Sequence, residues 1–442
     1  MTSFEERCIG LEQEFFLVDA AGALSGRADE FLKRCEELLE KAGRDPESFA
    51  PECARSMVEV NAPPVHSISE LSREYLAGAG LAIEAARDLD LRVYPLATYP
   101  LAAENTLRDE PRYDLQARAV GRERFQIAGR CAGVHIHLEA KAGTIDSRVG
   151  VSYDSAKAAR DGLLNLYNLA TALDPAMISL SRSCPFYAGK ATGVANRTAC
   201  YRGDPELFPG GLYSKLPLMG GLPPYAATIE DLVEQQFARH YSWLDTMERA
   251  GMDPRLLAET GDGLLQTSWN PVRLNAVGTV ELRGIDSNYP EMVLAIAALV
   301  KGAADRVRRE DLRVVPQEGL RAFEAAGDTL YVPDFEYLSG ELFREAATGG
   351  IQSSAVVSYL DSVLEFSRSN EDFGGFETLK TADGSYKSTE TEILQKFPTI
   401  SVLSEEEGLD LVREACDEFE EQVAELKRRE TTGMTKAGAN GD

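Results

Sequence analysis

Apolar residues recur along the chain at two different spacings, and these spacings separate the predicted helices from the predicted strands. Repeats of three and four residues are typical of a helix that packs one face against a core. They predict helices over residues 31–39, 71–89, 163–173, 232–247, 293–307 and 409–426. Alternation with a period of two is typical of strands and predicts them over residues 8–18, 56–61, 92–97, 133–139, 264–269 and 278–284.

The order of these elements indicates the fold class. Helices and strands intermix without a regular βαβ rhythm, which favours an α+β fold with a mostly antiparallel, curved sheet and helices packed on one face. We expect a single domain over residues 1–430 and a disordered tail over residues 431–442, where apolar residues are almost absent. A Pro/Gly-rich stretch over residues 209–225 is predicted to be a loop long enough to cover a site.

Four of the predicted strands carry an unusual polar face. In the segments GLEQEFFLV, MVEVN, GVHIHLE and TVELRG, the polar faces hold Glu12 and Glu14, Glu59 and Asn61, His135, His137 and Glu139, and Glu281 and Arg283. None of these faces contains a lysine, although lysine is common on solvated strands. Each face alone would also suit a solvated surface or a structural ion pair, but four together indicate a site.

The residue types of these faces point to a particular chemistry. Carboxylate oxygens suit hard divalent cations, a single imidazole is compatible with Mn²⁺ and tolerable for Mg²⁺, and arginine forks suit phosphate. Several carboxylates buried together without a cation would cost several kcal/mol each, or would titrate to the neutral form. The pattern therefore predicts a metal site that handles phosphate.

Charge and composition limit the partners. With 72 acidic against 46 basic side chains, the formal net charge is −26, so nucleic acid and anionic membrane surfaces are unlikely partners. The longest apolar run, residues 292–300, is too short to span a bilayer. The start, MTSFEERCIG, lacks the pattern of a signal peptide, and the 7 cysteines are scattered, which favours a cytoplasmic protein.

The ordered motifs resemble the glutamate–cysteine ligase and carboxylate–amine ligase family. The motifs are GLEQEF, PECARSMVEVNAPP, GVHIHLE, SCPFYAGKATGVANRTACYR and WNPVRLNAVGTVELRGID, which together span about residues 10–286. The resemblance implies a glutamine synthetase-like catalytic domain. It also implies an ATP-dependent enzyme that joins a carboxylate to an amine through an acyl phosphate, with glutamate and cysteine as the first choice of substrates.

The same resemblance implies roles for individual residues. The positions that match the family's ligands for two or three Mg²⁺ ions, with Mn²⁺ as the alternative, are Glu12, Glu14, Glu52, Glu59, His135 and Glu281. The basic positions Arg197, Arg273 and Arg283 match residues that contact the transferred phosphoryl group or substrate carboxylates, and we assign Arg197, Arg283 and His137 to nucleotide binding. Arg112 and Tyr113 fall where related enzymes place residues on the substrate side.

One position departs from the family pattern. Related carboxylate–amine ligases commonly have an acid after the tryptophan of WNPVR, and this chain has Asn270 instead. The amide removes one negative charge near the expected phosphate region, so amine recognition or the metal shell is expected to differ.

Three other interpretations compete with glutamate–cysteine ligation. Glutamate joined to another amine is the nearest, and a non-catalytic nucleotide-binding protein is more distant. A metal-dependent hydrolase also uses His-x-His strands, but such a site generally needs further imidazoles, and the chain has only 4 histidines. The oligomeric state is left open, with a homodimer as the first expectation.

Overall fold

A seven-stranded antiparallel sheet forms the centre of the protein. The computed structural model describes residues 7–260, 263–368, 376–398 and 400–439. The strand order is β10-β11-β5-β1-β3-β2, and β4 pairs with the far end of β1. The strands are β1 (Ile9–Asp19), β2 (Phe49–Pro51), β3 (Met57–Val65), β4 (Leu91–Tyr94), β5 (Gly133–Glu139), β10 (Val272–Asn275) and β11 (Thr279–Asp286).

The register of these strands aligns their polar residues across the sheet. On β1, Glu12 lies opposite His135 of β5 and opposite Asn61 of β3. Glu14 lies opposite Glu59 in the same β1–β3 pairing. Because side chains alternate along a strand, these pairings place the charged positions on one face and Leu11, Phe15 and their neighbours on the other.

Long helices cover the apolar face and bury it. The helices α2 (Ile68–Asp88), α5 (Lys157–Ser181) and α9 (Pro290–Arg309) contact β3, β11 and β5. A capping box between Ser67 and Glu70 starts α2, and Pro290 starts α9 at a position where no amide donor is needed. The main hydrophobic core lies between these helices and the sheet. The expected α+β fold is therefore confirmed.

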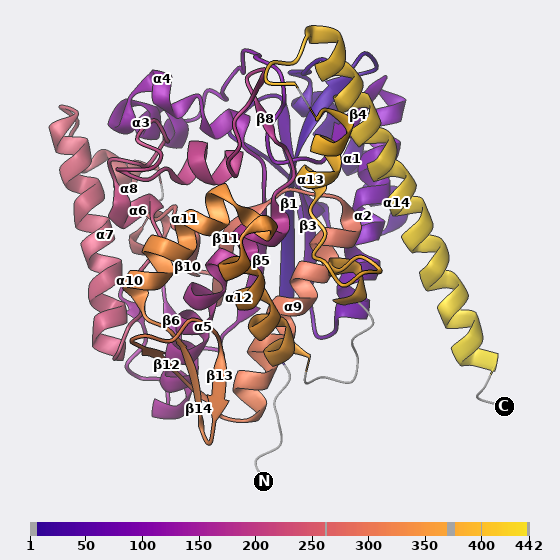
Figure 1. Ribbon diagram of the computed structural model, residues 1–442. Helices are drawn as coiled ribbons and strands as arrows, with labels where there is room; N and C mark the ends of the chain where they lie inside the picture. The colour runs from indigo at the N-terminus through magenta and orange to yellow at the C-terminus, as the bar shows by residue number, and fades with distance from the viewer. Residues whose placement is uncertain (1–6, 261–262, 369–375, 399, 440–442) are drawn as a thin grey trace.

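Other helices and loops lie over the polar face. They are α3 (Pro111–Val120), α4 (Arg122–Phe125), α6 (Pro217–Gly220), α7 (Ile229–Arg249) and α8 (Leu256–Glu259), with a π-helical turn over Thr198–Arg202. Their apolar side chains form a separate cluster around Trp243 and Trp269. Figure 1 shows α7 and α14 on opposite sides of the molecule, with the central sheet between them.

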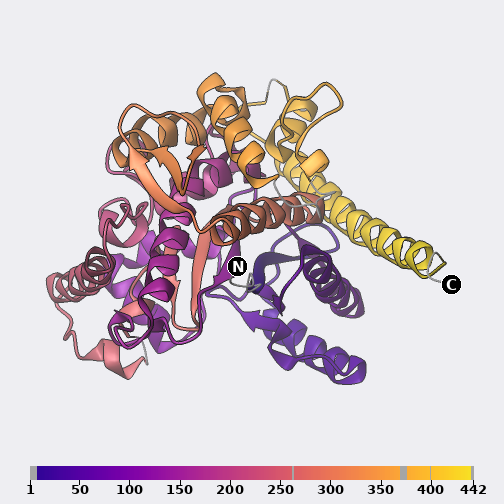
Figure 2. The ribbon, with the colours of Figure 1, turned by 90° about the horizontal axis from the view of Figure 1, so that it is seen from below.

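The remaining elements pack around this body. They are α1 (Ala28–Ala42), the two-stranded β6–β7 (Ile145–Asp146, Gly150–Val151) and β8–β9 (Phe186–Tyr187, Lys190–Ala191), the small sheet β12 (Arg313–Gln317), β13 (Glu324–Ala326) and β14 (Thr329–Pro333), and the helices α10 (Phe335–Tyr337), α11 (Phe343–Thr348), α12 (Ser354–Ser367), α13 (Thr389–Lys396) and α14 (Glu405–Ala439). In Figure 2 the end of α14 extends beyond the body. The backbone is helical to Ala439, within the segment predicted as a disordered tail, and residues 440–442 lie outside the described residues.

Two local predictions differ from the structure. The strand predicted over residues 264–269 is wrong, because Leu264–Gln266 forms a 3₁₀ turn whose leucines are buried. The predicted helix over residues 163–173 is longer, since α5 continues past Pro175 to Ser181 while packed in the core. Of the helices that the structure describes, none is both long and apolar enough to cross a membrane.

Candidate active site

The polar face of the sheet brings the predicted metal ligands together in three overlapping groups. In each group one ligand atom per residue lies within 4.8 Å of the others. The groups are Glu12 with Glu59 and His135, Glu12 with His137 and Glu281, and Glu14 with Glu52 and Glu59. All six carboxylate and imidazole positions implied by the resemblance therefore meet, and His137 joins them. These residues are called the ligand row below: Glu12, Glu14, Glu52, Glu59, His135, His137 and Glu281.

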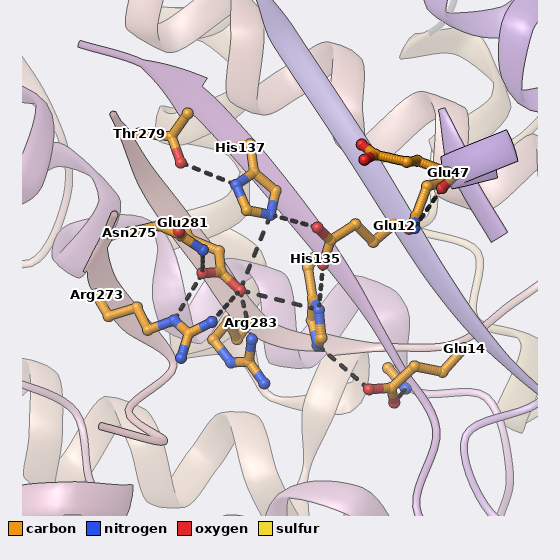
Figure 3. Close-up of polar contacts among 12 residues, drawn as sticks. Glu12, Glu14, Glu47, His135, His137, Arg273, Asn275, Thr279, Glu281 and Arg283 are labelled. Atoms are coloured by element: carbon orange, nitrogen blue, oxygen red, sulfur yellow. Dashed lines mark hydrogen bonds and ion pairs between the residues drawn. The ribbon is translucent and has the colours of Figure 1, made fainter. Parts of the chain in front are cut away.

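Glu12 lies at the centre of the row and contacts both imidazoles. Its Oε2 is 3.0 Å from Nδ1 of His135, and its Oε1 is 3.1 Å from Nε2 of His137 (Figure 3). Burial alone would favour the neutral acid, but the hydrogen bonds with the two histidines outweigh it and hold the pKa of Glu12 well below its usual range. Glu12 is thus an ionised ligand shared between two groups.

Glu281 is fully buried and is neutralised by two arginines. Its carboxylate accepts from Nε of Arg273 at 2.6 Å, from Arg283 at 2.5 Å and from Nδ2 of Asn275 at 2.7 Å. Burial opposes ionisation, but Arg273 and then Arg283 outweigh it, so the pKa of Glu281 lies well below its ordinary value. Asn275 was missed by the sequence reasoning, although it shares a strand face with Arg273.

At the opposite end of the row, burial and the charges of neighbouring acids dominate the pKa values of the carboxylates. Burial, followed by the charge of Glu14, raises the pKa of Glu52 to about 8. Burial and the charges of Glu12 and Glu52 raise the pKa of Glu59 well above its usual value. A bound divalent cation would reverse these shifts, because it favours the ionised form of each carboxylate.

The imidazoles also fit a metal site. Nε2 of His135 is buried and makes no hydrogen bond in the part of the chain that the structure describes, and Nε2 of His137 is buried against the Glu12 carboxylate at 3.1 Å. Burial and then Arg283 lower the pKa of His135, so its ring is neutral and has a lone pair available for a cation. The donor set of carboxylates and neutral imidazole suits Mg²⁺ or Mn²⁺.

A polar cavity of about 200 Å³ opens at the Glu14 end of the row. The predicted basic residues Arg197, Arg273 and Arg283 lie in its wall, together with Arg112 and Tyr113. The wall also contains aromatic residues that the sequence did not indicate, namely Phe125, Tyr201, Tyr213 and Trp269. The rings of Tyr213 and Trp269 are stacked with centroids 5.2 Å apart. The cavity combines positive charge with flat apolar walls.

A second cavity, of about 430 Å³, opens at the other end of the row. It shares Glu12 with the polar cavity and also reaches His137 and Thr279. Its other walls combine apolar residues, Ala62, Pro63, Pro64 and Val277 among them, with the acids Asp45, Glu47 and Glu139. The ligand row therefore lies between two cavities of different character.

Arg197 reaches the polar cavity over a glycine. A Cβ atom on Gly133 would collide with the Arg197 guanidinium, so a larger residue at the start of β5 would displace this arginine from its position. The guanidinium lies 5.5 Å from the centre of the Tyr201 ring. Burial raises the pKa of the neighbouring Cys131 thiol well above its usual range and that of Cys200 to about 11, which disfavours the thiolate form of both.

Asn270 does not belong to the ligand row. Its Nδ2 donates to the carbonyl oxygens of Leu218 at 3.0 Å and Gly221 at 2.7 Å, both in the stretch predicted to cover the site. The other two histidines also lie elsewhere, since His66 is 3.7 Å from the Cys8 thiol and His240 contacts Thr267. No third imidazole therefore completes a zinc site of the hydrolase type among the described residues.

The chain was compared with known proteins. The model of "Glutamate-cysteine ligase family 2 (GCS2)" matches residues 8–332. A candidate glutamate–cysteine ligase 2 of Ectopseudomonas mendocina is 31% identical over 42% of this chain and 43% of its own length. One of Pseudomonas aeruginosa is 25% identical over 70% of this chain and 69% of its own length. The first relatives are thus matched over only about half of their length.

The fold is also found in a solved structure. A bifunctional glutathione synthetase from Pasteurella multocida superimposes with a TM-score of 0.56 over 95% of this chain and 53% of that chain, at 14% sequence identity. This likeness concerns the fold alone. The family match covers most of the chain and includes every residue of the ligand row, so the protein belongs to glutamate–cysteine ligase family 2.

Proposed function

We propose that the protein is an ATP-dependent carboxylate–amine ligase, and that it joins the γ-carboxylate of L-glutamate to the amino group of L-cysteine. The observation that carries the proposal is the ligand row between two cavities, with Glu12 common to both. Membership of the family and the fold support it. The acids and imidazoles of the row would hold Mg²⁺, which when bound supplies positive charge against phosphate oxygens.

The two cavities suit different substrates. The larger one has apolar residues, Pro63, Pro64 and Val277 among them, against which a flat base would pack, and it reaches the row at Glu12 and His137. The smaller one has arginines for carboxylates and is about the size of an amino acid. ATP in the larger cavity and glutamate in the smaller one would therefore meet at the ligand row.

The reaction needs positioning rather than a protein nucleophile. A glutamate carboxylate oxygen attacks the γ-phosphorus, the bond to the bridging oxygen breaks, and ADP leaves. The amine then attacks the acyl carbon, loses a proton and displaces inorganic phosphate, which leaves an amide. Arg283 and Arg273, which pair with Glu281, would stabilise the charge that develops on the transferred group.

The decisive experiment measures phosphate release from Mg²⁺-ATP by the purified protein with L-glutamate, alone and with cysteine or a panel of other amines. The expected result is release that depends on cysteine, with a product whose mass equals both substrates minus water. Release with a different amine would replace cysteine and retain the ligase. No ATP turnover across the panel would refute the ligase.

A further inference from the structure

Two consecutive residues, Trp269 and Asn270, donate hydrogen bonds to a segment that lies over the polar cavity. The cover segment comprises residues 209–225 and contains the short helix α6. Its Tyr213 lines the polar cavity beside Trp269, and no residue of the cover segment lines the larger cavity. The segment therefore forms part of one cavity and not of the other.

The second half of the cover segment is attached through hydrogen bonds to its carbonyl groups. The amide of Trp269 donates to the carbonyl of Met219 at 2.8 Å. Nδ2 of Asn270 donates to the carbonyls of Leu218 and Gly221 at 3.0 and 2.7 Å. Helix α6 is too short to be stable by itself, so these contacts fix it in place.

Asn270 is buried, and its orientation is determined by partners on both sides. Only 1% of the residue is exposed, and its Oδ1 accepts from the Ser268 hydroxyl at 2.5 Å. The amide nitrogen therefore faces the two carbonyls, which need a donor. A carboxylate of the same shape would turn an oxygen toward them and replace attraction by repulsion.

The strand that follows connects this anchor to the ligand row. Nη1 of Arg273 donates to the Ser268 carbonyl at 3.2 Å while its Nε bonds Glu281. We infer that Asn270 is a positioning residue that fixes the cover segment over the polar cavity and thereby sets affinity for the amino-acid substrate, but not for ATP. The inference rests on the proposed function for the identity of that substrate.

The chain supplies a matched control at another buried asparagine. Asn105 also donates through Nδ2 to a backbone carbonyl, that of Gly129, and its Oδ1 accepts from the Ser56 hydroxyl at 3.1 Å. Both of these partners, Ser56 and Gly129, lie outside the cover segment. Asn270→Asp and Asn105→Asp thus introduce the same chemical change, and only the first one affects the anchor.

The first test follows amide hydrogen exchange in the full-length protein. The amides of Met219, Gly220 and Gly221 are bonded within α6. In Asn270→Asp they should exchange at least about tenfold faster than in the wild type, and in Asn105→Asp at the wild-type rate. Unchanged exchange in Asn270→Asp, or equal acceleration in both variants, would overturn the inference.

The second test uses steady-state kinetics with Mg²⁺-ATP, L-glutamate and L-cysteine. In Asn270→Asp the KM of L-glutamate, the substrate proposed for the polar cavity, should rise at least about tenfold, while the KM of ATP stays within about twofold. A rise shared by ATP would contradict the inference. If Asn270→Asp does not fold, Asn270→Ala should shift the same KM in the same direction, and failure to do so counts against it. Absence of ATP turnover in the wild type would refute the proposed ligase function. Hydrogen exchange would then still test whether Asn270 fixes the cover segment.

Discussion

At the scale of single residues, Glu12 belongs to two of the three ligand groups, and it is the residue common to both cavities. Glu12→Gln keeps the shape of the side chain but removes the charge that a divalent cation needs. We expect roughly 10–100-fold weaker Mg²⁺ activation, because loss of a ligand or its support has effects of that size. The measurement is phosphate release as a function of Mg²⁺ concentration.

A carboxylate outside the site provides the control for Glu12. The side chain of Glu74 is 29% exposed, compared with 30% for Glu12, and it pairs with Arg44. Glu74→Gln should leave the Mg²⁺ dependence unchanged. Equal curves for wild type and Glu12→Gln would remove Glu12 from the metal site.

Asp286, at the end of β11, leads to a prediction about pH. Burial raises its pKa to about 7, against the partial opposition of Arg197. Because the folded state binds the proton more tightly than the unfolded state, this residue makes the protein less stable as pH rises from about 4 to about 7, by roughly 4 kcal/mol at most. Asp286→Asn should reduce that loss. Parallel melting-temperature curves of both proteins between about pH 5 and 8 would contradict the assignment.

The candidate site could be predicted where it lies on regular strands. Alternation identified Glu12, Glu14, Glu59 and Glu281, because a period of two determines which side chains share a face. Glu52 precedes β3 in an irregular segment, so only the family resemblance indicated it. The aromatic wall was missed, since Tyr213 and Trp269 are brought together by tertiary packing that no local pattern encodes.

At the scale of elements, β1 is fixed by a buried glutamine on the face opposite the ligands. Nε2 of Gln13 donates to the Ser287 hydroxyl at 2.9 Å and the Asn288 carbonyl at 2.8 Å, and its Oε1 accepts from the Tyr75 hydroxyl at 2.6 Å. Gln13→Leu leaves the Asn288 carbonyl and the Tyr75 hydroxyl without their hydrogen-bond partner. We expect a loss of roughly 2–5 kcal/mol in the free energy of unfolding, measured by urea titration.

A double-mutant cycle tests whether this network is the cause. Tyr75→Phe removes the hydroxyl, so the double variant with Gln13→Leu should lose less than the sum of the two single losses. Strict additivity would show that the two side chains are not energetically coupled.

The elements that the sequence predicted best are those with a long periodic pattern. β5 begins and ends where predicted, and β1, β3 and β11 differ by only a few residues at their ends. The segment at residues 264–269 was misassigned because two adjacent buried leucines suit a turn in the core as well as a strand. The length of α5 was underestimated because tertiary packing overrides the local effect of Pro175.

At the scale of the whole molecule, the part of the chain beyond the family match is joined to the catalytic body. Glu390 of α13 pairs with Arg182 at the end of α5, and each side chain is only 7% exposed. Glu390→Ala would leave Arg182 buried without its anion, so we expect a loss of roughly 3–5 kcal/mol in unfolding free energy.

An exposed ion pair between neighbouring elements serves as the comparison. Lys396 and Glu414 are 2.8 Å apart, and their side chains are 60% and 55% exposed. Glu414→Ala should cost less than about 1 kcal/mol. Similar unfolding curves for the two variants would show that Arg182 does not depend on Glu390. The cytoplasmic location and the homodimer stay predictions.

The position of the ligand row between the two cavities also bears on the order in which substrates bind. Under the proposed assignment, an amino acid in the polar cavity would not obstruct the larger cavity, and ATP in the larger cavity would leave the polar one open. Neither partner then has to arrive before the other. A compulsory order of binding, if kinetics reveal one, would then come from the charge that the first substrate brings to the shared carboxylate of Glu12, and not from one substrate blocking the cavity of the other.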